Sequence, residues 1–190
     1  GYALIAVGHT IIFGLMRVSN FAHGELYMLG AYFTYTFVNI WNLPFGIGFV
    51  LSILGGALLG YLLNRFVFRY VRDDMTTNGL VTIGISIFLT NIAQYIWGAA
   101  PRAIKSPFKG ETIFIGNVAI TPARMFIIFA ALIAIVLFFC IIKYTKTGKA
   151  FRATFQKREA AQLVGIDVER IYSISTILGT VMACIAGSLL

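Results

Sequence analysis

Long apolar segments separated by short polar connections are the feature that most constrains the fold of this 190-residue chain. Crossing a bilayer as a helix takes about 17–25 apolar residues, and six segments reach or approach that length. They are Gly1–Met16, Leu26–Trp41, Phe45–Leu63, Leu80–Ala100, Met125–Ile142 and Ile171–Leu190. Hydrophobic residues make up 59% of the chain and charged residues 12%, against about 45–50% and about 25% in soluble domains. We therefore expect an all-α fold, a polytopic bundle of about six transmembrane helices in one domain over residues 1–190. Because apolar residues begin and end the chain, we also expect it to be truncated at both ends.

The distribution of basic residues predicts which side of the membrane each connection faces. The net charge is +8, but the basic residues lie between apolar segments, which is typical of the positive-inside bias and gives no reason to expect a nucleic-acid partner. If the six segments alternate, the connections on one side hold Arg17, Arg65, Arg69, Arg72, Lys143, Lys146, Lys149, Arg152, Lys157, Arg158 and Arg170. Those on the other side hold only Arg102, Lys105, Lys109 and Arg124. The loop 143–170 is therefore predicted to be cytoplasmic.

The opposite loop, residues 101–124, has a β-type pattern. Two short runs rich in β-branched residues, 111–115 and 118–121, flank Gly116-Asn117. A two-residue Gly-Asn connection between such runs is typical of a β-hairpin. We expect a short external hairpin, which could serve as a lid or docking surface or be merely a compact loop.

A polar break, residues 17–25, separates the first two apolar segments. It contains Asn20, His23, Gly24 and Glu25. As a cytosolic turn, these residues would be solvated and uninformative. Within the membrane, such groups must face a cavity, a partner or one another, and Gly-punctuated polar breaks often line substrate pathways. The pattern leaves both interpretations open.

The loop 143–170 is strongly charged and carries helix-forming residues from about 149 to 164, with Gly165 placed to end the helix. Phe151 and Phe155 are four residues apart and would share one face. A short helix with exposed aromatic residues suits a groove on a soluble partner. An amphipathic helix lying on anionic lipid is the alternative.

The run from Phe13 to Tyr32, with Asn-Phe-Ala-His-Gly-Glu at residues 20–25, closely resembles the early signature of the branched-chain amino acid permeases. These are membrane subunits of importers driven by ATP-binding-cassette (ABC) ATPases. A sister group that imports urea or short amides usually carries Met where this chain has Phe21. This difference favours branched-chain or related amino acids as the substrate, with urea or short amides as the alternative. The resemblance implies a substrate pathway near the polar break, to which we assign Asn20, His23, Gly24, Glu25, Asn91 and Gln94.

A second resemblance lies in the cytoplasmic loop, where Glu159-Ala160-Ala161, three residues and then Gly165 are similar to the coupling-helix motif of ABC importer permeases. It implies contact with the ATPase through Phe151, Arg152, Glu159, Ala160, Ala161 and Gly165. The implied partners are two ABC ATPase subunits, a second homologous permease subunit, an extracytoplasmic substrate-binding protein and the lipid bilayer. The implied location is the cytoplasmic or inner membrane of a bacterium or archaeon.

The sequence contains no motif for enzymatic chemistry. No G-x-x-x-x-G-K-[ST] run exists to cradle a phosphate, and His9 and His23 stand apart from other residues at metal-ligand spacing. We therefore expect no cofactor, no metal and no catalytic residue. The rival functions are an ion-coupled secondary transporter, a lipid-modifying membrane enzyme and a purely structural subunit.

Overall fold

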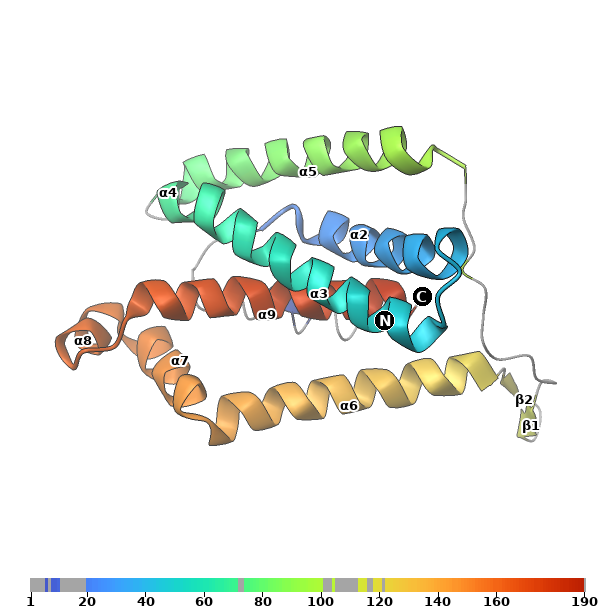
Figure 1. Cartoon of the computed structure of the whole chain (residues 1–190). Coiled ribbons are helices and arrows are strands. Elements are labelled where there is room, and N and C mark those ends of the chain that lie inside the picture. Colours follow the sequence, from blue (N-terminus) through green and yellow to red (C-terminus); the bar gives the residue numbers. More distant parts are fainter. Residues whose placement is uncertain are drawn as a thin grey trace.

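The computed structural model describes residues 6, 8–10, 20–71, 74–100, 104, 113–115, 118–120 and 122–189. These residues are overwhelmingly helical, which confirms the all-α class (Figure 1). The elements, in chain order, are α2 (His23–Tyr35), π-helix η1 (Thr36–Ile40), α3 (Phe45–Leu63), π-helix η2 (Asn64–Phe68), α4 (Arg69–Val71), α5 (Met75–Trp97), β1 (Ile113–Ile115), β2 (Val118–Ile120), α6 (Pro122–Tyr144), α7 (Lys146–Gln156), α8 (Arg158–Leu163) and α9 (Val168–Ser188).

Four helical stretches in the described part of the chain are long and apolar enough to cross a membrane. They are Phe45–Val71, Thr76–Trp97, Met125–Tyr144 and Val168–Ser188. Each overlaps an apolar segment identified in the sequence. Most of the first expected segment, Gly1–Met16, lies outside the described residues. The second, Leu26–Trp41, corresponds to α2 and η1, which are not among the four candidate membrane spans. The expected number of six spans therefore stays a prediction.

Helix α9 is the centre of the bundle and packs against both α2 and α3 (Figure 1). Small residues bring these backbones close together. A Cβ atom at Gly187 would overlap the Tyr27 carbonyl of α2, and one at Gly56 of α3 would lie 2.5 Å from Cys184 Sγ. In a bilayer, close packing of this kind replaces the hydrophobic effect between helices.

Buried hydroxyl groups join the same three helices. Thr34 of α2 donates to Ser188 of α9 over 2.7 Å. Ser52 of α3 lies 3.0 Å from Ser188 and donates to the Gly30 carbonyl over 2.9 Å. Interhelical hydrogen bonds in lipid contribute about 0.6–2 kcal/mol each, so this network strengthens the α2–α3–α9 core.

Strands β1 and β2 pair in antiparallel register, with Ile115 opposite Val118. The two residues of the connection, Gly116 and Asn117, lie outside the described residues. In Figure 1 the strands lie at the end of α6 far from α7 and α8. That the hairpin is external remains a prediction.

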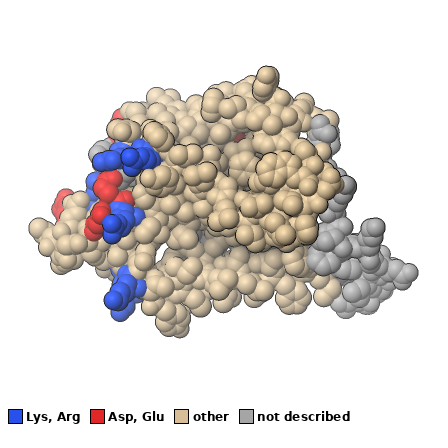
Figure 2. Space-filling view, in the orientation of Figure 1, with Lys and Arg blue, Asp and Glu red and all other residues tan. Residues whose placement is uncertain are grey.

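Charged side chains gather at the end of the bundle that carries α4, α7 and α8, at the left of Figure 2. Every Lys and Arg whose side chain is described belongs to the elements that meet there. They are Arg65, Arg69, Lys143, Lys146, Lys149, Arg152, Lys157, Arg158 and Arg170. We call this end the basic end. The remaining basic side chains lie outside the described set, so the comparison of the two membrane sides stays a prediction.

Candidate functional site

The polar break begins helix α2 and is buried. The side chain of Asn20 is 1% exposed and that of His23 is 4% exposed. Asn20 Oδ1 accepts a hydrogen bond from the Ala22 amide over 3.1 Å, and the Asn20 carbonyl accepts one from the His23 amide over 3.2 Å. Asn side chains favour this local pairing, which turns the chain into a helix. Of the pathway residues expected here, only Gly24 is exposed.

Glu25 faces helix α5. Its Oε1 accepts a hydrogen bond of 2.6 Å from the Ser86 hydroxyl. Its Oε2 is buried and has no hydrogen-bond partner among the described residues. A carboxylate inside an apolar bundle is costly and marks a candidate functional group.

Helix α5 contributes a row of polar side chains to this contact. Asn78, Thr82 and Ser86 are spaced four residues apart, so they share the helix face that meets α2. Asn78 is 1% exposed and Thr82 is fully buried. The four-residue spacing is a signal that the sequence analysis missed. We call the buried surface formed by Asn20, His23, Glu25, Asn78, Thr82 and Ser86 the α2–α5 polar seam.

The seam contains buried polar atoms without partners in the described part of the chain. They are Asn20 Nδ2, Glu25 Oε2 and both side-chain polar atoms of Asn78. Each buried unpaired group costs about 1–3 kcal/mol. A folded protein carries such groups where something polar, such as water or a ligand, completes them.

The two histidines are neighbours in space although 14 positions separate them in the chain. The rings of His9 and His23 have centroids 5.4 Å apart and are tilted by 56°. The sequence separates these two residues, but the fold places their rings side by side. The folding of residues 8–10 against His23 and α9 brings them together. No group of three or more His, Cys, Asp or Glu that could hold a metal ion occurs within the described residues.

Asn91 and Gln94, which were expected to line the pathway with Asn20–Glu25, lie outside the seam. Both side chains are exposed, and Asn91 Nδ2 donates to the Ile87 carbonyl of its own helix over 2.7 Å. An α-helix turns about 100° per residue, so Asn91 lies about 140° around α5 from Ser86. At the far end of the α2–α5 contact, Trp97 Nε1 donates to Thr36 over 2.8 Å. This hydrogen bond joins α5 to η1.

The loop 143–170 forms two helices, α7 and α8, whereas we expected one from about 149 to 164. Thr145 caps α7 by accepting a hydrogen bond from the Gly148 amide over 3.0 Å. Lys157 then takes an extended conformation, with φ −152° and ψ 105°, between α7 and α8. The break lets both helices turn a buried residue toward the bundle, Phe151 from α7 and Ala161 from α8.

Phe151 is 5% exposed and packs in the cluster of Phe138 and Tyr172. The expectation that Phe151 and Phe155 form one exposed face is therefore wrong, and only Phe155, 57% exposed, reaches the surface. Arg152 is exposed and donates to the Ile142 carbonyl of α6. These contacts hold α7 against α6 and α9.

The end of α8 exposes apolar side chains. Leu163 is 88% exposed and Val164 is 75% exposed, and α8 protrudes from the basic end (Figure 1). Gly165 has φ +81°, and its amide donates to the Gln162 carbonyl while the Ile166 amide donates to Ala161, both over 3.0 Å. This pair of bonds is a Schellman motif, which favours glycine at the left-handed position. The prediction that Gly165 ends the helix is confirmed.

Comparison with known proteins identifies one family. The model of the family described as "Branched-chain amino acid transport system / permease component" matches residues 1–190. No solved structure matches the chain.

Curated relatives match along the whole chain. The high-affinity branched-chain amino acid transport system permease proteins LivH of Salmonella typhimurium and of Escherichia coli are each 32% identical over 206 residues, covering 100% of this chain and 66% of the relative. The permease protein BraD of Pseudomonas aeruginosa is 28% identical over 202 residues, with the same coverage. The chain thus spans just under two thirds of the length of these relatives.

Proposed function

Because the chain belongs to the branched-chain amino acid transport permease family, we propose that it forms part of the membrane permease subunit of an ABC importer and carries branched-chain amino acids inward. The relatives LivH and BraD are named as permease proteins of high-affinity branched-chain amino acid transport systems. The bilayer is its solvent, and its location is the cytoplasmic or inner membrane. On this proposal the chain crosses the membrane about six times, with the basic end in the cytoplasm and the β1–β2 hairpin outside.

The observation that carries the proposal is the α2–α5 polar seam. An amino acid is a zwitterion, so its passage needs acceptors for the ammonium group and donors for the carboxylate. Among the described residues, Glu25 Oε2 is a buried acceptor without a partner, and the amide nitrogens of Asn20 and Asn78 are buried donors without partners. The seam thus offers both kinds of group.

Within this seam, Asn20, His23 and Glu25 from the sequence-based site are joined by Asn78, Thr82 and Ser86. Gly24 is exposed beside them and leaves the α2 backbone open to a neighbouring element. Asn91 and Gln94 lie on the outer face of α5 and suit contact with a second permease subunit or lipid rather than with the substrate.

For energy coupling, we propose that the protruding end of α8 docks into an ATPase subunit. Leu163 and Val164 offer an apolar anchor, and Glu159 and Ala160 are exposed beside them. A few desolvated apolar side chains surrounded by polar ones are typical of docking sites. Phe151 and Ala161 anchor α7 and α8 to the bundle. Arg152 stabilises the junction of α6 and α7, and Gly165 stabilises the C-terminal end of α8.

The proposed cycle has two states. ATP binding closes two separate ATPase subunits, α8 follows them, and the movement passes through α7 to α9 and the helices packed on it. The α2–α5 polar seam then opens to one side of the membrane or the other. An extracytoplasmic binding protein delivers the substrate, and a second homologous permease completes the pathway.

The test uses the full-length permease reconstituted in proteoliposomes with its partner permease, ATPases and binding protein. We expect ATP-dependent uptake of labelled leucine that excess isoleucine or valine suppresses and urea does not. Uptake that persists without ATP would refute ATP-driven transport and favour an ion-coupled transporter.

Coupling is tested separately by Leu163→Asp, with Leu163→Met as its matched control. Leu163→Asp places a charge in the apolar contact, so we expect substrate-stimulated ATP hydrolysis and uptake to separate, while Leu163→Met preserves both. Gly165→Pro and Glu159→Lys are expected to uncouple in the same way while the protein remains in the membrane. Normal coupling in Leu163→Asp, Gly165→Pro and Glu159→Lys would rule out the docking assignment.

A further inference from the structure

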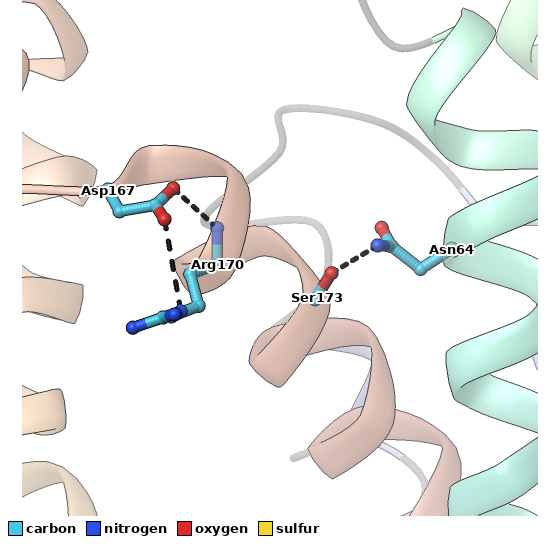
Figure 3. A network of polar contacts seen from close by, with 4 residues as sticks. All are labelled: Asn64, Asp167, Arg170 and Ser173. Atoms are coloured by element: carbon cyan, nitrogen blue, oxygen red, sulfur yellow. Dashed lines mark hydrogen bonds and ion pairs between the residues drawn. The ribbon is translucent and has the colours of Figure 1, made fainter.

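A polar cavity of about 250 Å³ lies between the end of α3, the π-helix η2 and the start of α9, at the basic end. Its lining includes the guanidinium groups of Arg65, Arg69 and Arg170 and the carboxylates of Asp167 and Glu169. Arg170 Nε is 3.8 Å from Asp167 Oδ2 (Figure 3). The cavity therefore presents both signs of charge, and Arg65 and Arg69 are its cations on the α3 side.

The wall of this cavity also holds a buried hydrogen-bond acceptor. Asn64 is 4% exposed and donates through Nδ2 to the Ser173 hydroxyl across the gap between η2 and α9 (Figure 3). Asn64 Oδ1 is buried and has no partner in the described part of the chain. Asn64 begins the π-helix η2, a kind of local widening that is frequent at functional sites. The unpaired oxygen requires an N–H or O–H donor.

An apolar stripe leads away from the cavity along α3. Leu54, Leu58 and Leu62 are spaced four residues apart and are 59%, 60% and 39% exposed. Arg65 in η2 and Arg69 in α4 follow this stripe along the chain. The stripe and the two arginines belong to one candidate membrane span, Phe45–Val71. The surface therefore changes from apolar to cationic where the span reaches its end.

We propose that the cavity binds the head group of a membrane phospholipid that carries a primary amine, a phosphoethanolamine group. The phosphate lies against Arg65 and Arg69, the ammonium group donates to Asn64 Oδ1, and the acyl chains lie along the leucine stripe. Basic pockets at the cytoplasmic ends of membrane helices bind phosphate head groups. A purely anionic head group would leave Asn64 Oδ1 without a donor among the described residues. This lipid site does not depend on which solute the permease carries.

The test is native mass spectrometry of the detergent-purified full-length permease with phosphatidylethanolamine, its N,N-dimethyl derivative and phosphatidylcholine, all with the same acyl chains. A quaternary ammonium has no N–H to donate, so we expect phosphatidylcholine to bind about tenfold more weakly than the other two, the effect of losing one hydrogen bond to a charged group. The double variant Arg65→Gln, Arg69→Gln should lose binding of all three lipids. Lys149→Gln, which changes an exposed lysine outside the cavity, should keep the preference.

The comparison among lipids on the unaltered protein decides the proposal even if a variant fails to fold. Equal binding of phosphatidylethanolamine and phosphatidylcholine overturns it. Phosphatidylglycerol with the same acyl chains, which has no amine, is measured as a fourth lipid. If it binds more strongly than phosphatidylethanolamine, the proposal is also overturned. A preference that survives in the double variant places the lipid elsewhere and overturns the assignment to this cavity.

Discussion

Ser86 of α5 donates a hydrogen bond of 2.6 Å to Glu25 of α2, across 61 positions of sequence. This bond ties the only carboxylate inside the described part of the bundle to the polar face of α5. The other carboxylate oxygen is buried and unpaired among the described residues. The fold therefore positions one oxygen of the Glu25 side chain.

Ser86→Ala removes the donor that positions Glu25. Loss of a hydrogen bond to a charged buried group corresponds to about a tenfold change, so we expect leucine uptake in proteoliposomes to fall roughly tenfold. Asn91→Ala, on the exposed face of the same helix, is the control and should stay within about twofold of the parent, as surface changes do. Equal losses in the two variants would contradict the assignment of the pathway to the α2–α5 polar seam.

Asn78→Leu should reduce transport without reducing stability. Its two side-chain polar atoms are buried without partners among the described residues, and replacing such a group by an apolar one of similar shape is neutral or stabilising. We therefore expect the thermal unfolding temperature in detergent to stay the same or rise while leucine uptake falls. A lower unfolding temperature with intact uptake would identify Asn78 as a structural residue.

Gly187→Ala should destabilise the bundle because the added Cβ overlaps the Tyr27 carbonyl of α2. Overpacking of a close contact costs about 1–3 kcal/mol. Gly84→Ala is a matched control, since a Cβ at Gly84 meets nothing within 4 Å. Thermal unfolding in detergent should therefore separate the two variants, and equal unfolding temperatures would contradict the close α2–α9 packing.

Asp74 caps the N-terminus of α5, and its titration predicts a pH dependence. A hydrogen bond from the Thr77 hydroxyl, followed by those from the Thr76 and Thr77 amides, lowers the pKa of Asp74 from its ordinary 3.8. Because the folded pKa is lowered, the stabilisation is complete above the ordinary value and is lost as pH falls below it through the folded pKa. Asp74→Asn keeps a capping side chain without a titrating group.

The measurement for Asp74 is thermal unfolding in detergent at a series of pH values from neutral to below 3.8. Stability of the parent should fall more than that of Asp74→Asn once pH drops below the ordinary value. Parallel curves for the two proteins would show that the cap does not contribute through its charge.

The loop 143–170 shows which features a local sequence pattern can predict. Gly165 was predicted to end a helix, and it does, because a Schellman motif is a local structure that one residue type favours. The break at Lys157 and the burial of Phe151 were missed, since both follow from how α7 packs against α6 and α9. Leu163 and Val164 protrude for the same reason, because α8 turns its small residue Ala161 inward.

Helix α5 shows the same difference between what the sequence pattern predicts and what packing determines. Composition and segment length were enough to predict membrane helices, because a bilayer imposes both on any chain that crosses it. They gave no means of choosing between Ser86 and Asn91, two polar residues on the same helix. Packing against α2 made that choice, since only Ser86 faces Glu25. The sequence alone therefore determined that the chain is an all-α membrane protein, while the tertiary structure decided which polar groups are buried together and which face outward.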